Sequence, residues 1–475
     1  MRILFVEDND GFADDLTLAL LDIDGVSSID RVIDKQTAGE KLVSGLVDLI
    51  ILDLSILPTP DSDAPVADHG QALFHEARAS RPGTPIFILT GEEVEKFSRG
   101  LAKYGNQVML WGATTSTETV SFFLKEEVSE LLARIRDLAS SFAAMDAITM
   151  NTRGKELGMT PVQTQMLKTF ARSADGVACD VSLLHGGLSD AKVVKATAMD
   201  LARRPQAICA GKLGPSEVIA TELSAYERHV RKLGIGACPP IYCSITDGVG
   251  QHGAIFYTLT DNDTLSLFER LSHNSEIGAI VVGNVRAALQ RWSEAATADM
   301  VPLSEIRARM IDDPDTEDVV LKFGIEKLRS IESKQIHISK SCIHGDLHCG
   351  NVLVKSDGGA VLIDFGDAGP GFTCLDPIAL ELSLLFHPDA QKFGLRNSLI
   401  DHLEKWPNID IFAESDPLRN TIVACREWSH DVGGSDQAVL ACAYAYAMRQ
   451  LKYDTVDPAI TLGFLSLLAE RLAAS

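Results

Sequence analysis

Residues 343–369 read IHGDLHCGNVLVKSDGGAVLIDFGDAG, and this stretch decides the fold of the longer part of the chain. Asp346 is followed five residues later by Asn351, and two short apolar runs then flank a pair of glycines before Asp364. Two apolar runs joined by a glycine turn predict a hairpin, which brings Asn351 and Asp364 beside each other. Phosphoryl transfer needs oxygen ligands for Mg²⁺ and a carboxylate that accepts the proton of the attacking hydroxyl. The spacing therefore predicts a phosphoryl-transfer site.

The pattern HGDLHxGN followed by IDFGD resembles the aminoglycoside phosphotransferase and choline-kinase group of protein-kinase-like enzymes. The resemblance implies that Asp346 is the catalytic base and that Asn351 and Asp364 hold Mg²⁺. It also implies ATP as phosphoryl donor and an alcohol group as acceptor. His348 stands where protein kinases have a lysine, which argues against a protein substrate. We expect His344 and Asp367 to hold the loop together by hydrogen bonds.

The same resemblance implies a two-lobed α+β domain over residues 177–475. Apolar runs and glycine turns indicate a small lobe rich in strands at 177–260, and helical patterns indicate a larger lobe at 261–475. Only the segment around residues 342–367 interrupts the helical pattern of the larger lobe.

The nucleotide side of the site is expected in the small lobe. The segment HGGLSDAKVV contains Gly186, Gly187 and Ser189, whose backbone N–H groups can fold over phosphates. A plain hairpin turn is an equal alternative for this loop.

Lys212 ends the next apolar run, and a helix is predicted from Ser216. A Lys–Glu pair would fix this lysine over the α- and β-phosphates. Glu222 is the favoured partner because the family pattern has an apolar residue four positions later, here Tyr226. Glu227 stays open as the alternative partner.

The first part of the chain alternates buried-strand patterns with amphipathic ones. The apolar runs lie at 3–6, 49–54 and 85–90, and amphipathic stretches lie between them. This alternation predicts a doubly wound parallel sheet within residues 1–140. Residues 141–176 are expected to form a helical connector, with a helix beginning at Thr160-Pro161.

Three acidic residues are expected at one edge of this sheet. Glu7 and Asp8 follow the first strand, and Asp53 lies in an apolar strand where an unpaired carboxylate is costly. Ligands of open parallel sheets lie outside the carboxyl ends of the strands, and Mg²⁺ favours such carboxylates. Thr90 supplies a hydroxyl and Lys125 a cation, so that an aspartate here can accept a phosphoryl group.

The motifs VEDN, DLIILDL, ILTG and FFLKE, in this order, resemble the receiver domains of bacterial response regulators. The resemblance implies a flavodoxin-like fold and a histidine kinase or phosphotransfer protein as phosphoryl donor. The residues that it implies are the phosphoacceptor Asp53, the Mg²⁺ ligands Glu7, Asp8 and Asp53, the switch residues Thr90 and Phe122, and Lys125 at the phosphoryl group. The interval from Thr90 to Lys125 exceeds that of the family, which indicates an insertion near 103–119 and leaves Lys103 as an alternative to Lys125.

Composition excludes some partners. The net charge of −23 repels nucleic acid and anionic membrane surfaces, so neither is expected as a partner. No run of about 18 apolar residues indicates a membrane span, and MRILFVEDND does not resemble a signal peptide. The nine cysteines form no CxxC pairs, so we expect them to be reduced thiols of a cytoplasmic protein. The sequence is also compatible with a homodimer.

Two hypotheses follow for the whole chain. In the first, phosphorylation of Asp53 regulates an ATP-dependent phosphotransferase that acts on a hydroxyl compound. In the second, the kinase-like part is a nucleotide-binding pseudokinase or scaffold that relays receiver phosphorylation to a partner protein without catalysis. The presence of Lys212, Asp346, Asn351 and Asp364 together favours the first.

Overall fold

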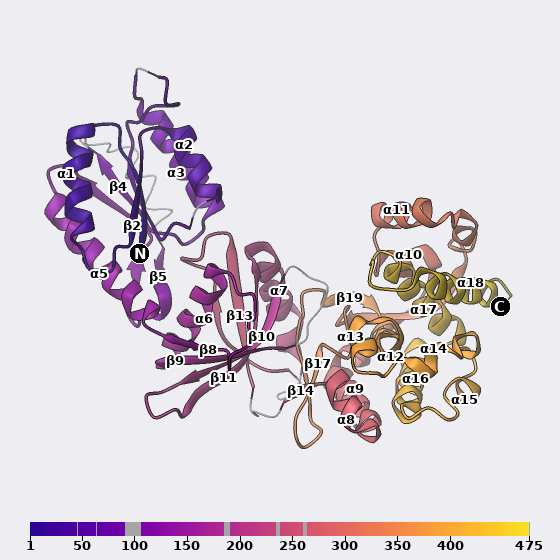
Figure 1. Ribbon diagram of the computed structural model, residues 1–475. Helices are drawn as coiled ribbons and strands as arrows, with labels where there is room; N and C mark the ends of the chain where they lie inside the picture. Colours follow the sequence, from indigo (N-terminus) through magenta and orange to yellow (C-terminus); the bar gives the residue numbers. More distant parts are fainter. Residues whose placement is uncertain are drawn as a thin grey trace. The chain divides into compact units, whose positions relative to one another are not determined.

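The computed structural model describes residues 1–44, 46–62, 64–90, 106–184, 191–233, 238–259 and 264–474 (Figure 1). The chain forms two compact units. The first unit contains residues 1–183 and the described residues 191–219 and 241–258. The second contains the described residues 220–233, 238–240 and 264–474.

A five-stranded parallel sheet opens the first unit, in the order β2-β1-β3-β4-β7. Its strands are β1 (Arg2–Val6), β2 (Ser28–Val32), β3 (Leu49–Asp53), β4 (Ile86–Thr90) and β7 (Val120–Leu124). This order and the parallel pairing are those of the flavodoxin-like doubly wound fold. The predicted fold class of this part is confirmed.

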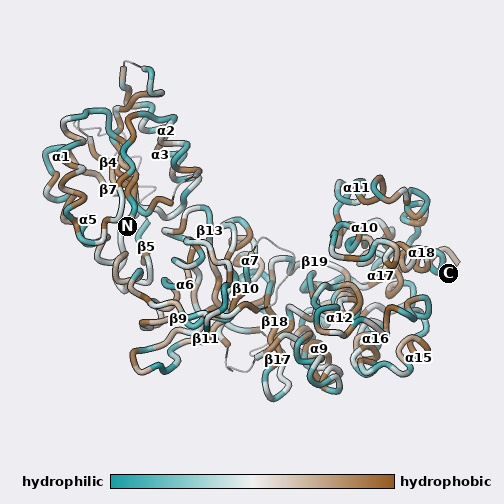
Figure 2. The backbone as a smooth tube through the Cα atoms, viewed as in Figure 1, coloured by the Kyte–Doolittle hydropathy of each residue, from teal (hydrophilic) through white to brown (hydrophobic). Residues whose placement is uncertain are grey.

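Two helices cover each face of the sheet (Figure 1). Side chains at alternate positions of each strand point to opposite faces, which is why the central strands β1, β3 and β4 are mainly apolar (Figure 2), whereas the edge strand β2 includes Asp30 and Arg31. Ile3 and Phe5 pack toward one helix pair, and Leu4 and Val6 pack toward the other. The pairs are α1 (Asp10–Leu21) with α5 (Val128–Asp146), and α2 (Lys35–Ser44) with α3 (Ala67–Ser80).

The predicted insertion before β7 forms small elements within the described residues 106–119. These are β5 (Gln107–Val108), the 3-10 turn η1 (Leu110–Gly112) and β6 (Thr117–Glu118). The ring of Trp111 is buried edge-on against Phe142 of α5, with ring centroids 5.1 Å apart. The carbonyl oxygen of Trp111 accepts a hydrogen bond of 3.1 Å from Arg172 of the helix that follows α5. The insertion thus joins the parallel sheet to the next layer of the same unit.

A six-stranded sheet completes the first unit, in the order β12-β13-β11-β10-β9-β8. Its strands are β8 (Thr149–Asn151), β9 (Ala178–Leu183), β10 (Lys192–Met199), β11 (Pro205–Pro215), β12 (Ile241–Ile245) and β13 (His252–Thr258). Helix α6 (Pro161–Ser173) packs on it and begins at Thr160 with a capping box, as predicted. Residues 141–176, expected as a helical connector, therefore include the strand β8 as well as α6.

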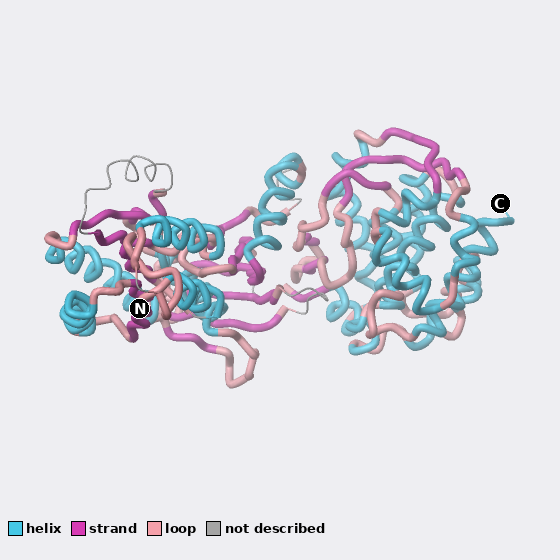
Figure 3. The backbone as a smooth tube through the Cα atoms, turned by 90° about the horizontal axis from the view of Figure 1, so that it is seen from above, coloured by secondary structure: helices cyan, strands magenta, loops and turns pink. Residues whose placement is uncertain are grey.

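The second unit is built mainly from helices (Figure 3). They are α7 (Ser216–Arg228), which begins in the first unit, α8 (Leu267–His273), α9 (Gly278–Glu294), α10 (Leu303–Ala308), α11 (Asp313–Phe323), α12 (Leu375–Phe386), α13 (Pro388–Lys392), α14 (Asn397–Ile400), α15 (Ile409–Phe412), α16 (Arg419–Gly433), α17 (Asp436–Gln450) and α18 (Pro458–Ala474). No helix among the described residues has the length and the apolar character needed to cross a membrane.

Two three-stranded sheets accompany these helices. One joins β14 (Leu265–Ser266), β17 (Val352–Val354) and β18 (Ala360–Leu362), and the other joins β15 (Thr297–Pro302), β16 (Gln335–Ile343) and β19 (Gly369–Phe372). The sequence pattern predicted helices on both sides of 342–367, and β15 and the start of β16 differ from that. In β16 the buried Ile336 and Ile338 alternate with exposed residues, which is the period of a strand.

We expect Phe256→Ala to lower the free energy of unfolding of the first unit by about 3–5 kcal/mol. Phe256 is fully buried in β13 and stacks on Phe170 of α6, with ring centroids 4.3 Å apart, so truncation leaves a cavity. Urea unfolding followed by circular dichroism measures the change. Leu201→Ala is the control, because Leu201 is 89% exposed and its loss should cost less than about 0.5 kcal/mol. Equal losses in both variants would contradict the packing described.

Candidate functional site

Three carboxylates meet at the carboxyl edge of the parallel sheet. Glu7 and Asp8 follow β1 and Asp53 ends β3, and one oxygen atom from each lies within 4.8 Å of the others. The backbone N–H of Asn9 donates to Glu7 Oε1 at 3.1 Å, and that of Ser55 donates to Asp53 Oδ1 at 3.2 Å. Three hard oxygen donors at this spacing fit a Mg²⁺ ion.

Lys125 brings a cation to this cluster from the end of β7. Its Nζ lies 2.8 Å from Asp53 Oδ2 and 2.7 Å from Glu7 Oε2. Lys125 therefore contacts two of the predicted acidic residues, although an unusually long segment separates it from Thr90 in the sequence. The alternative, Lys103, lies outside the described residues.

The acidic cluster changes the affinity of its members for protons. Burial raises the pKa of Glu7, although the hydrogen bond from Lys125 opposes this. Burial and then the charge of Asp53 raise the pKa of Asp8. Burial opposes the charge on Lys125, but the hydrogen bonds to Asp53 and Glu7 outweigh it, so the pKa of Lys125 is raised. The lysine is thus charged at neutral pH.

The remaining predicted receiver residues lie on β4, which pairs with β3, and on β7, which pairs with β4. Thr90 ends β4 and pairs in register with Leu124 of β7, and its side chain lies outside the description. Phe122 of β7 is partly buried against the core shared with α2 and α3.

The predicted nucleotide-binding residues are distributed over the two units. Lys212 lies on β11 between Val193 of β10 and Ile255 of β13, and it is 6% exposed. A lysine so deeply buried in a strand is uncommon. Gly186, Gly187 and Ser189 lie outside the described residues.

The two glutamates considered as partners of Lys212 have different surroundings on α7. Glu222 is fully buried. Glu227 is exposed and forms a surface ion pair with Arg231. A buried carboxylate requires a partner, whereas an exposed pair of this kind contributes little. Burial therefore favours Glu222 over Glu227 as the glutamate that needs a charged partner.

The predicted hairpin is present in the second unit. Strand β16 ends at Ile343, and β17 and β18 pair antiparallel on either side of a turn in which Gly358 has φ 84°. The backbone N–H of Ile363 donates to the carbonyl oxygen of Asn351 at 3.1 Å, which places Asp364 next to Asn351. Asn351 Nδ2 in turn donates to the carbonyl oxygen of Asp346 at 2.8 Å. The loop thus brings together the three residues predicted from its spacing.

Asp364 adopts a backbone conformation that is uncommon for a residue with a side chain. Its φ is 65°, in the left-handed region. The next residue, Phe365, is fully buried between the rings of His344 and Tyr226, at centroid distances of 5.1 and 6.2 Å. Strained backbone of this kind gathers at functional sites, where packing of the neighbours maintains it.

The start of the loop is held from helix α12. The carboxylate of Asp376 accepts hydrogen bonds of 2.8 Å from the N–H of His344 and 3.0 Å from that of Gly345. Gly345 has φ 84°, and a Cβ there would lie 2.5 Å from the carbonyl oxygen of Asp367. His344 Nε2 lies 3.1 Å from the carbonyl oxygen of Ile363, as a loop-holding residue should.

The role of Asp367 differs from the predicted one, and one residue that holds the loop was not predicted. Asp367 contributes its backbone carbonyl, which accepts from Arg309 at 2.6 Å, and no side-chain bond of Asp367 is seen in the described part of the chain. Asp376 was missed. Its signal was a carboxylate in a predominantly apolar and fully buried helix.

A cation from α17 contacts Asp346 directly. Arg449 Nη1 lies 2.8 Å from Asp346 Oδ1, and its Nε donates to the hydroxyl of Tyr453 at 3.3 Å. Burial would raise the pKa of Asp346, but the charge and hydrogen bond of Arg449, together with the neighbouring His348 and His344, outweigh burial and hold that pKa well below its usual range. The aromatic and Met residues of α17 have the helical spacing of a buried core, so the local pattern gives no sign of this contact.

His348 completes the surroundings of Asp346. Its Nε2 lies 3.8 Å from Asp346 Oδ2, and its ring stacks on that of His387 at 4.6 Å. Burial lowers the pKa of His348, and burial also lowers that of His387 to about 3, so both rings are neutral at pH 7. Arg449 is therefore the charged partner of Asp346.

Comparison with known proteins agrees with this geometry. The model of the phosphotransferase enzyme family (APH) matches residues 225–380, which include Asp346, Asn351 and Asp364. A sequence comparison with curated proteins finds no match.

Several solved structures are similar to parts of the chain. A receiver domain protein from Methanospirillum hungatei JF-1 is 19% identical over 29% of this chain and 93% of its own, with a TM-score of 0.22. The receiver domain of a Francisella response regulator is 19% identical over 29% of this chain and 96% of its own, with a TM-score of 0.21. A glucosamine kinase in complex with glucosamine, ADP and inorganic phosphate is 13% identical over 67% of this chain and 87% of its own, with a TM-score of 0.32.

The strand order of the first sheet, its acidic edge and the loop around Asp346 lead to one conclusion. The chain joins a flavodoxin-like domain with a carboxylate cluster at its sheet edge to a second domain, of which residues 225–380 match the model of the phosphotransferase enzyme family.

Proposed function

We propose that this chain is a two-component signalling protein in which phosphorylation of Asp53 regulates an ATP-dependent phosphotransferase acting on a hydroxyl compound. The observation that carries the proposal is the loop in which Asn351 is bonded to Asp346 and paired with Ile363 beside Asp364. One carboxylate for the acceptor and two oxygen ligands for a metal are what phosphoryl transfer requires.

In the receiver domain, the proposed donor is a histidine kinase or a phosphotransfer protein. An oxygen of Asp53 attacks the phosphorus, an acyl phosphate bond forms, and the bond from phosphorus to the donor breaks. Glu7, Asp8 and Asp53 would hold Mg²⁺, which supplies positive charge to the phosphoryl oxygens. Lys125, now bound to Asp53 and Glu7, moves its charge to the new phosphoryl group. Thr90 and Phe122 are the proposed switch residues.

In the kinase-like domain, Asp346 orients the acceptor hydroxyl and receives its proton as the new O–P bond forms and ADP leaves. The low pKa of Asp346 favours orientation first and proton transfer late, which suits the loose transition state of phosphoryl transfer. Asn351 and Asp364 would hold Mg²⁺, which neutralises charge on the nucleotide phosphates. Lys212, with Glu222 as its proposed partner, binds phosphate.

A second candidate function rests on the contact between Arg449 and Asp346. A guanidinium that occupies the carboxylate at 2.8 Å favours a nucleotide-binding pseudokinase, in which the kinase-like domain relays the receiver signal to a partner protein without catalysis. Turnover measurements distinguish the two functions.

Beryllofluoride, which mimics the phosphoryl group on Asp53, should change the affinity of the chain for MgATP. Coupling between two sites typically amounts to about 1–3 kcal/mol, or roughly 5–150-fold in affinity. Calorimetric titration with MgATP, with and without beryllofluoride, measures it. The control is Asp53→Asn, which should show no effect of beryllofluoride and should not be phosphorylated by acetyl phosphate. Identical titrations of the wild type in both conditions would refute regulation within the chain.

Asp346→Asn should separate nucleotide binding from chemistry. Turnover should fall by roughly 10²–10⁴-fold, the contribution of a positioned acid or base, while MgATP affinity changes little. Asp364→Asn should instead weaken MgATP binding and its dependence on Mg²⁺, because a charged ligand of the ion is lost. Calorimetry and release of labelled phosphate measure the two properties. The roles are reversed if Asp346→Asn abolishes binding and Asp364→Asn leaves both properties intact.

Mg²⁺ binding to the receiver domain, without nucleotide, should weaken as the pH falls from about 7.5 to about 4.5, the ordinary range of a carboxyl group. Burial raises the pKa of Glu7 and of Asp8, so protons compete with the metal at pH values above those at which ordinary carboxylates become protonated. Calorimetric Mg²⁺ titrations at both pH values provide the measurement, with Asp364→Asn as a control that should keep the dependence. An affinity that stays constant over this range would show that these carboxylates are not the ligands.

A further inference from the structure

A pocket of about 260 Å³ opens beside the Asp346 loop, wholly within the second unit. Its lining includes Gly345 and Asp367 of the loop, Arg309 after α10, and Arg449 from α17. Arg449, which lines the pocket, contacts the carboxylate of Asp346 at 2.8 Å, so the pocket lies next to the proposed catalytic base, although Asp346 is not one of its lining residues. A space of this size suits a small molecule.

Three cations line the pocket, and two of them have carboxylate partners. Lys452 forms an ion pair with Asp315, and Arg449 forms one with Asp346. Arg309 differs, because its guanidinium donates to two carbonyl oxygens, of Pro370 at 3.1 Å and of Asp367 at 2.6 Å. No carboxylate of the described chain forms an ion pair with it.

Three acidic residues line the pocket, and two of them have other partners. Asp312 caps helix α11, and its Oδ1 accepts from the N–H of Asp315 at 2.8 Å. The positive end of the helix stabilises this carboxylate. Asp315 is neutralised by Lys452, and Asp367 contacts Arg309 through its backbone carbonyl rather than its carboxylate. Arg309 is therefore the lining cation that forms no ion pair with a carboxylate of the described chain.

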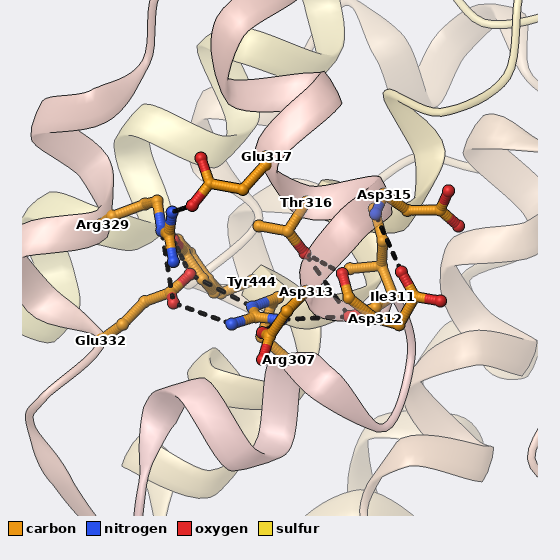
Figure 4. Close-up of polar contacts among 10 residues, drawn as sticks. All are labelled: Arg307, Ile311, Asp312, Asp313, Asp315, Thr316, Glu317, Arg329, Glu332 and Tyr444. Carbon is orange, nitrogen blue, oxygen red and sulfur yellow. Dashed lines mark hydrogen bonds and ion pairs between the residues drawn. The ribbon is translucent and has the colours of Figure 1, made fainter.

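Two residues before Arg309 in the sequence, Arg307 is at the centre of a buried network of polar contacts (Figure 4). Arg307 is 2% exposed and donates to the carbonyl oxygen of Ile311 at 3.2 Å and to Asp313 at 2.7 Å. Its other side is bonded to Glu332, which also accepts from the hydroxyl of Tyr444. These bonds fix the segment between α10 and α11, so the guanidinium of Arg309 is positioned before a ligand arrives.

We propose that this pocket binds an alcohol that carries a carboxylate or phosphate group, with Arg309 as the residue that selects for the anion. The hydroxyl lies toward Asp346 and the anionic group toward Arg309, because a guanidinium fork matches both oxyanions. Arg449 is a positioning residue that holds Asp346 Oδ1 and leaves Oδ2 to the hydroxyl. The proposal rests on the proposed function and specifies its acceptor.

Four small alcohols test the anion requirement on the full-length chain with MgADP bound. Glycerate carries a carboxylate, glycerol 3-phosphate a phosphate, ethanolamine a cation, and glycerol no charge. Calorimetric titration should show that glycerate, glycerol 3-phosphate or both bind at least roughly tenfold more tightly than ethanolamine and glycerol. The first two arms distinguish the two oxyanions.

Variants of Arg309 identify the residue responsible. Arg309→Gln should weaken anion binding by roughly 10–100-fold and remove the preference, and Arg309→Lys should retain part of it. Arg286→Gln is the matched control, because Arg286 is an exposed arginine of the same unit, paired with Asp431. It should bind all four alcohols as the wild type does.

Several results would overturn the proposal. These are ethanolamine binding as tightly as the anions, no binding of any of the four alcohols, or an unchanged preference in Arg309→Gln. An equal loss of MgADP and anion affinity in that variant would assign Arg309 a structural role through Asp367 and Pro370. Phosphoryl transfer from labelled ATP is measured separately, so that anion binding without turnover contradicts the proposed function and leaves this inference standing.

Discussion

A carboxylate taken out of water must meet a cation or a hydrogen-bond donor, and this constraint organises both units. Asp53 and Glu7 meet Lys125 at the edge of the first sheet. Asp376 meets two backbone N–H groups of the loop, and Asp346 meets Arg449. The chain has a net charge of −23. The carboxylates named here can be buried because they have these partners, and the pairings hold the segments around them in place.

The same constraint distinguishes buried carboxylates that stabilise packing from carboxylates that can still bind a ligand. Glu381 is buried beneath Arg426 and the indole N–H of Trp406, with every bond inside the helical core. Asp346 is bonded to Arg449 through one oxygen, and its side chain remains 26% exposed next to the pocket that Arg449 lines. A buried, satisfied pair specifies packing, whereas a half-satisfied carboxylate at a pocket has an oxygen left for a ligand.

In the first unit, the six-stranded sheet meets the receiver domain at the end of the strands opposite to Asp53. Arg2, at the start of β1, bonds Gln165 of α6, and Gln165 bonds the carbonyl oxygen of Gly248. Gly83, just before β4, has φ 75°, and a Cβ there would lie 2.3 Å from Asp247. These contacts thus join the two sheets at the end of the strands far from Asp53, and the insertion around Trp111 provides a second connection to α6.

The sequence alone determined the doubly wound order of elements, the acidic edge and the hairpin after Asp346, because strand periodicity and short motif spacing are local properties. It did not predict β15, whose residues are mostly exposed and show no apolar alternation. Only the tertiary structure brought Arg449 to Asp346 over 103 positions, and Asp376 to the loop over about 30. Both contacts depend on how α12 and α17 pack around the loop. Side chains that meet through helix packing have no fixed spacing in the sequence, so local patterns could not reveal them.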